Sequence, residues 1–191
     1  MLMSETRTDS SPGEKNGSQT GSSQRVRHVG LSVGTSRLVV SREGADGFQY
    51  AQQRTSYLVL PHSNMTLRTL EALQIPTLSR GGKLVVYGNE AENLADLFRV
   101  EARRPLKQGI LNPEEPESED HLLRLLASVV GLGSNEETRL CFTVPSLPLT
   151  EAEGVRYQIS ALLRLAQKLG MKGCSVEKAL AVVFAEMKDS N

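Results

Sequence analysis

Apolar and polar residues alternate over the first ordered part of the chain. The two-residue period of half-buried strands covers residues 26–31 and 37–42, and a third strand is expected near residues 48–52. Between the second and third strands, residues 43–47 have the glycine and aspartate content of a turn. Because tight turns join antiparallel neighbours, this segment predicts a three-stranded antiparallel meander.

The middle of the chain combines short apolar runs with helical spacing. Residues 57–61 form an apolar run, a helix is expected over about residues 65–73, and residues 83–88 have the composition of a strand. Asn89 and Ser118 are the expected N-terminal caps of the next two helices. The second of these helices should end at the glycine at position 131.

A strand and two helices are expected toward the C-terminus. Residues 140–144 form an apolar strand that ends at Pro145, and Thr150 with Glu153 makes the capping box of a helix that a glycine ends at position 170. Ser175 is the expected cap of a last helix, in which one face carries Val176, Leu180, Val183 and Met187. Antiparallel neighbours combined with a helical crossover predict an α/β fold, a mixed sheet flanked by helices.

Composition narrows the classes of protein. At 191 residues and 39% hydrophobic, the chain can form one sizeable core, preceded by a Ser-, Thr- and Gly-rich disordered tail over residues 1–26. The 22 basic and 22 acidic residues cancel, which argues against nucleic acid as a partner. The longest apolar run, residues 179–185, is far shorter than the roughly 20 residues that span a bilayer. No apolar signal segment follows Met3, so a cytoplasmic location is expected.

The turn between the first two strands carries the clearest candidate chemistry. Gly34 lacks a Cβ that would keep a phosphate away, and Thr35 and Ser36 add hydroxyl donors to the backbone N–H groups of the turn. Such a turn can cradle an anion. An ordinary hairpin explains the same residues, so the spacing alone leaves both interpretations open.

Histidines and cysteines indicate no further site. His28, His62 and His121 fall in different predicted elements without ligand spacing, so surface or packing positions are expected, and no metal ligands are assigned. Cys141 and Cys174 fit neither a metal motif nor a disulfide framework. Simple packing or incidental exposure is the expectation for both thiols.

Residues 30–36, 87–91, 104–110 and 176–181 are four stretches that, in this order, resemble the first half of the actin-like ATPase superfamily, most closely bacterial filament proteins of the MreB and MamK type. Residues 30–36 resemble the family's first phosphate loop, and residues 87–91 the strand-to-helix step of its inserted subdomain. Residues 104–110 match its Arg-Pro-Leu-x-x-Gly segment, and residues 176–181 lie where it has a Glu-Pro-x-Ala-Ala helix start. The likeness covers about residues 27–187.

This resemblance implies an actin-like (RNase H-like) first lobe over residues 27–191, with a smaller inserted subdomain at about residues 53–108. In that family two lobes close over ATP and Mg²⁺, and polymerisation promotes hydrolysis. By resemblance, the phosphate hairpin consists of Ser32, Gly34, Thr35 and Ser36, and Glu177, in the first turn of its helix, positions the attacking water. Taken alone, Glu177 would only complement the helix dipole.

Departures from the family pattern weaken the expected chemistry. Ser32 stands where the family's loop begins with an aspartate, so it brings no charge to hold Mg²⁺. Lys178 replaces the proline of the helix start. The Asp-x-Gly-x-Gly-Thr pattern of the second phosphate loop does not occur in the sequence. ATP and Mg²⁺ are therefore cofactors implied by the resemblance that we expect to bind weakly, or not at all, to this chain alone.

The leading hypothesis is an actin-like cytoskeletal protein, or a truncated part of one, that self-associates into filaments or contacts a protein partner and does not hydrolyse ATP alone. The alternative is a non-enzymatic adaptor or capping module that binds a filament or another partner. An Hsp70-like chaperone relative ranks third, because residues 104–109 resemble the filament branch. The basic cluster of Arg103, Arg104 and Lys107 can contact a partner, although a solvated charged turn is the simpler interpretation.

Overall fold

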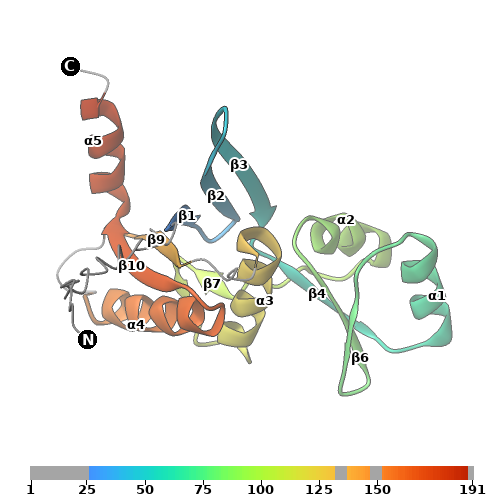
Figure 1. Cartoon of the computed structure of the whole chain (residues 1–191). Coiled ribbons are helices and arrows are strands. Elements are labelled where there is room, and N and C mark those ends of the chain that lie inside the picture. Colours follow the sequence, from blue (N-terminus) through green and yellow to red (C-terminus); the bar gives the residue numbers. More distant parts are fainter. Residues whose placement is uncertain (1–25, 132–136, 147–151, 189–191) are drawn as a thin grey trace, which may run out of the picture.

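The computed structural model describes residues 26–131, 137–146 and 152–188 (Figure 1). Apart from Val26, the predicted tail over residues 1–26 lies outside these ranges, and so does Thr150 of the predicted capping box. The described elements are, in chain order, β1 (Arg27–Val33), β2 (Arg37–Gly44), β3 (Gly47–Arg54), β4 (Tyr57–Pro61), α1 (Asn64–Ala72), β5 (Leu78–Arg80), β6 (Lys83–Tyr87), α2 (Asn89–Phe98), β7 (Leu106–Lys107), β8 (Ile110–Leu111), α3 (Ser118–Val130), β9 (Thr138–Val144), α4 (Ala152–Lys168), β10 (Lys172–Glu177) and α5 (Lys178–Lys188).

The main sheet has five strands in the order β10-β9-β1-β2-β3. Strands β1, β2 and β3 pair antiparallel, which confirms the predicted meander, whereas β9 and β10 run parallel to β1. Parallel neighbours need a crossover, and α4 supplies the one between β9 and β10. The fold class is therefore the predicted mixed α/β sheet with flanking helices.

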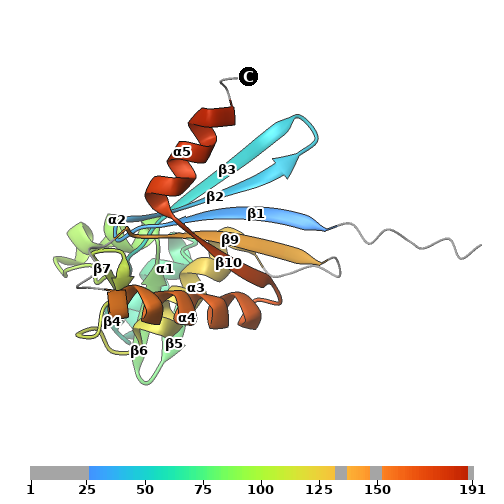
Figure 2. The ribbon, with the colours of Figure 1, turned by 90° about the vertical axis from the view of Figure 1, so that its left-hand side faces the viewer.

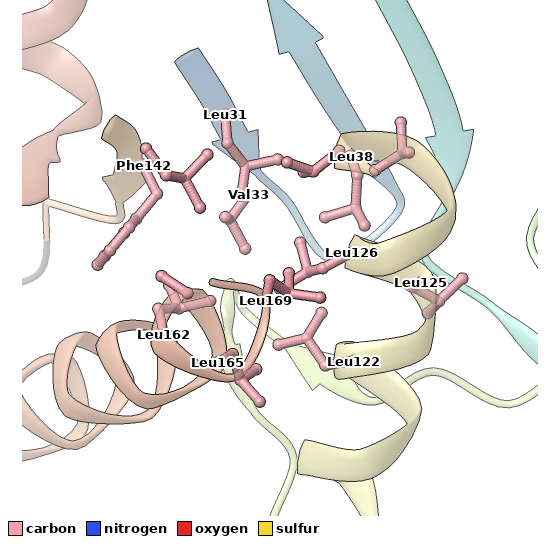
Figure 3. Close-up of a cluster of buried hydrophobic side chains, with 14 of the residues drawn as sticks. Leu31, Val33, Leu38, Leu122, Leu125, Leu126, Phe142, Leu162, Leu165 and Leu169 are labelled. Carbon is pink, nitrogen blue, oxygen red and sulfur yellow. The ribbon is translucent and has the colours of Figure 1, made fainter. Parts of the chain in front are cut away.

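One face of this sheet is buried under α3 and α4 (Figures 2 and 3). In β1 the buried residues are Val29, Leu31 and Val33, which alternate with partly exposed ones as a half-buried strand requires. Across the core, α3 contributes the buried leucines at 122, 125 and 126, α4 contributes those at 162 and 165, and Leu169 follows directly after α4. Helix α5 leaves the end of β10 on the opposite side of the sheet (Figure 1).

A smaller three-stranded antiparallel sheet, β4-β6-β5, forms a second hydrophobic cluster with α1 and α2. Leu58 and Leu84 are fully buried within it, beside Leu70 of α1. This cluster lies within residues 58–94, inside the stretch predicted as an inserted subdomain. The limits of that subdomain, about residues 53–108, stay a prediction.

The predicted start of the last helix is wrong. Ser175 does not cap a helix, because Lys172–Glu177 forms strand β10 and pairs in register with β9. Helix α5 begins only at Lys178, so Glu177 ends a strand and does not lie in the first turn of a helix. The helical spacing of apolar residues continued back into the strand, and only pairing with β9 distinguishes the two structures.

Two predicted caps are also wrong, although the helices themselves form. Gly88 is the N-cap of α2, and the Asn89 side chain accepts a hydrogen bond from the Arg54 N–H instead (3.1 Å). Glu117, in a left-handed conformation, precedes α3, which Ser118 begins without a side-chain cap. At its other end α3 stops before Gly131 as predicted, where the Arg42 guanidinium donates to the carbonyls of residues 129 and 130 (2.6 and 2.7 Å).

Candidate functional site

The parallel strands β1, β9 and β10 end at a common edge of the main sheet, where the hairpin turn of residues 34–36 lies. The Val33 N–H donates to the Thr143 hydroxyl (3.2 Å), which joins the ends of β1 and β9. Ser32 is half-buried one residue earlier, and Glu177 ends β10 exposed, with Val144 of β9 as its partner in register. The carboxyl edge of parallel strands is the usual place for ligands in α/β proteins.

The conformation of the hairpin turn accounts for its glycine. A Cβ at position 34 would lie 2.9 Å from the Arg37 carbonyl oxygen, so the turn itself excludes a side chain whether or not an anion binds. From behind, the fully buried Thr55 donates its hydroxyl to the Gly34 carbonyl (2.9 Å) and its N–H to the Ser36 carbonyl (3.2 Å). These two hydrogen bonds hold the Gly34 and Ser36 carbonyl groups toward the protein interior.

Donor groups remain available at the tip of the turn. Within the described part of the chain, no hydrogen bond uses the amides of Thr35 or Ser36, or the hydroxyls of Ser32 or Ser36. The Thr35 hydroxyl is different, because its oxygen accepts the Gly109 N–H at 2.7 Å. The structure thus brings together two of the four motif stretches found in the sequence, residues 30–36 and residues 104–110.

Electrostatics do not favour a highly charged ligand here. A hollow of about 390 Å³ beside Thr35 is lined by the basic cluster, but each cation has a carboxylate partner. The pairs are Arg103 with Glu115 (2.6 Å), Arg104 with Glu92 (3.1 Å) and Lys107 with Glu114 (2.9 Å). All three basic side chains are exposed, which supports the interpretation as a solvated charged turn.

A buried aromatic cluster joins the two hydrophobic clusters, and no sequence motif predicts it. The His121 ring of α3 stacks on Tyr57 of β4, with ring centroids 3.7 Å apart, and its Nδ1 lies 3.0 Å from the Tyr87 hydroxyl. The Tyr57 hydroxyl bonds to Glu115, which also pairs with Arg103. Burial, followed by the bond to Glu115, raises the pKa of Tyr57. His121 is thus a packing histidine, as expected.

Acid should weaken this cluster. Burial lowers the pKa of His121 below its usual value, so the unfolded chain takes up the proton first as pH falls. The stability that neutral His121 provides is full above about pH 6.5 and is lost as pH falls toward the folded-state pKa. We expect the free energy of unfolding, measured by urea titration between pH 8 and 5.5, to fall more steeply for the natural chain than for His121→Phe. Parallel pH profiles would contradict this expectation.

Among the described residues, no group of three or more His, Cys, Asp or Glu side chains is placed to hold a metal ion. Across the same ranges, the helices are too short or too polar to cross a membrane.

Comparisons with known proteins agree with the sequence resemblance. A family model described as Volactin matches residues 28–191. The MamK double helical filament is 21% identical, with a TM-score of 0.53, and the match covers 79% of this chain and 41% of that chain. This likeness shows that the fold is actin-like. The present chain thus spans less than half the length of the MamK chain.

Two further solved structures are more distant. The AlfA filament from the B. subtilis plasmid pLS32 is 11% identical, with a TM-score of 0.40 over 70% of this chain and 45% of that chain. RuvC from Thermus thermophilus is 12% identical, with a TM-score of 0.29 over 79% of this chain and 63% of that chain. No curated protein matches the sequence.

Proposed function

The chain belongs to the Volactin family, and from this membership and the actin-like fold we propose that it is an actin-like cytoskeletal protein, or part of one, carrying one degenerate wall of an ATP site. The observation that supports the proposal is that Ser32, the Thr35 and Ser36 amides and Glu177 all lie at the carboxyl ends of the parallel strands β1, β9 and β10. Backbone amides in a glycine turn are donors suited to phosphate oxygens. Glu177, an exposed carboxylate at the same end of the strands, is the acid that we propose orients a water molecule.

The degenerate character follows from charge. Ser32 offers a hydroxyl where a carboxylate would hold the water shell of Mg²⁺. The three cations that line the hollow beside Thr35 are already paired with glutamates, so they give a phosphate chain little net attraction. An open wall also leaves most of a nucleotide in water, whereas good pockets bury about 70–90% of a ligand's surface.

Calorimetry tests this site. We expect ATP, with or without MgCl₂, to give no saturable binding at micromolar concentrations to the purified chain, because position 32 offers no carboxylate to hold Mg²⁺ and the wall does not enclose the nucleotide. This experiment tests the nucleotide site and does not test the fold. Micromolar affinity would therefore overturn the degenerate site while leaving the family assignment in place.

A specific surface favours the second candidate function, a non-enzymatic adaptor or capping module. Helix α5 exposes large apolar side chains over most of its length, among them Phe184, which is 60% exposed. The others are Leu180, Val182, Val183 and Met187. Apolar surface of this extent usually marks a contact with another protein.

Self-association distinguishes the two functions. A filament subunit should pellet in the ultracentrifuge in a concentration-dependent way and show filaments in negative-stain electron microscopy. An adaptor should remain monomeric over the same concentration range. A monomer at every concentration would therefore shift the assignment from filament subunit to adaptor.

A further inference from the structure

The two cysteines, 33 residues apart in sequence, occupy one row of the main sheet. Cys141 of β9 and Cys174 of β10 are partners in the parallel register, and both are exposed. Leu140 and Phe142, the neighbours of Cys141 in the strand, are buried under α4, so the thiols belong to the opposite face. Figure 2 shows the two strands side by side.

Space around the thiols is open on the β1 side. The residue that pairs with Cys141 on β1 is Gly30, which has no side chain. A Cβ built there would approach only Ser41 of β2, at 3.7 Å. The Cys141 thiol therefore has free volume on one side and the Cys174 side chain, its partner in register, on the other.

The spacing of the strands suits a bridging ion better than a direct bond. Neighbouring strands lie about 4.7–4.9 Å apart, and paired side chains leave the sheet at a similar separation. A disulfide needs Cβ atoms about 3.5–4.5 Å apart, so the two paired side chains would have to lean toward each other. Two metal–sulfur bonds of about 2.3 Å each span roughly 4.6 Å when nearly linear. A bridging ion would leave the strands where they are.

The ligand set selects the kind of ion. Within the described ranges no third His, Cys, Asp or Glu completes a metal site, which disfavours ions that need four protein ligands. Soft thiolates favour Cu(I), which two sulfur ligands can satisfy. We propose that Cys141 and Cys174 form a two-thiolate site for a soft monovalent cation of the Cu(I) class.

Binding involves proton release and no change of oxidation state. Each thiol gives up one proton, each sulfur donates a lone pair to the cation, and the product is a bis-thiolate complex with one negative charge.

The test is a competition titration of the reduced full chain with Cu(I) and bicinchoninate under anaerobic conditions. We expect one Cu(I) per chain. Cys141→Ser and Cys174→Ser should each weaken binding by more than about 100-fold, because losing a group that merely supports a ligand already costs about 10–100-fold. Both positions are exposed, so these conservative changes should leave the fold intact, which circular dichroism checks.

A matched control tests whether Cu(I) binding needs the two thiols to be paired across the strands or only needs two thiols in the chain. The double variant C174S/S175C keeps two thiols but moves one to the other face, because position 175 is the partner of Phe142 in register. It should bind as weakly as the single variants. The proposal is overturned if this variant binds like the natural chain, if either single variant keeps its full affinity, or if the natural chain fails to compete with the indicator.

Discussion

Phe142→Ala should lower the free energy of unfolding by about 3–5 kcal/mol, the usual cost of removing a buried aromatic side chain. Phe142 is fully buried in the centre of β9, and its ring lies against Gly173 of β10 and the residues of α4 (Figure 3). Gly173 itself packs against Leu163 and Ala166 of that helix, so little can move in to fill the space. Urea unfolding followed by circular dichroism measures the change.

The same substitution at an exposed phenylalanine is the control. Phe184 lies on α5 and is 60% exposed, so Phe184→Ala should change the free energy of unfolding by less than about 0.5 kcal/mol. Equal losses in the two variants would mean that α5 is packed in solution against something other than the described chain. A loss below about 1 kcal/mol at Phe142 would contradict its place in the core.

Gly88→Ala should cost roughly 2–4 kcal/mol, from backbone strain of about 1–3 kcal/mol and the displacement of a neighbouring side chain. Gly88 has φ +71° and ψ −138°, a conformation that side chains rarely allow. A Cβ there would overlap the Gln53 side chain, whose amide oxygen accepts the Ser128 hydroxyl at 2.7 Å. The loss is measurable by the same urea titration.

Gly82→Ala provides the comparison. Gly82 also has φ +71°, but a Cβ at that position meets no atom within 4 Å. We expect a loss of about 1–2 kcal/mol from the left-handed conformation alone. The difference between the two variants then reports the contact with Gln53 together with the strain of ψ −138° at Gly88, and equal losses would show that Gln53 moves aside freely.

The sequence predicted local structure well where one face of an element is buried. Alternation in the β1 and β2 segments identified the meander, because Leu31, Val33 and Leu38 must all point into one core. Strand β10 was missed because Gly173, Cys174 and Ser175 have little intrinsic preference for a strand. These residues are extended only because β9 offers an edge to pair with.

For the candidate site, the turn was predictable and its surroundings were not. Glycine and hydroxyl residues mark positions 34–36 in the sequence itself. Thr55 reaches the turn across 21 residues of sequence, and Gly109 reaches Thr35 across 74. Contacts at such separations depend on how the sheets are placed, and one sequence carries no direct record of them.

The bond between the Gly109 N–H and the Thr35 hydroxyl has a mechanical consequence. It ties the tip of the β1–β2 hairpin to the tight turn between β7 and β8, with a distance of 2.7 Å between the Gly109 nitrogen and the Thr35 hydroxyl oxygen. Gly109 also lies against Pro145, just beyond the end of β9. A ligand that displaces the hairpin tip must therefore also displace the β7–β8 turn and the end of β9, because the three segments are in contact.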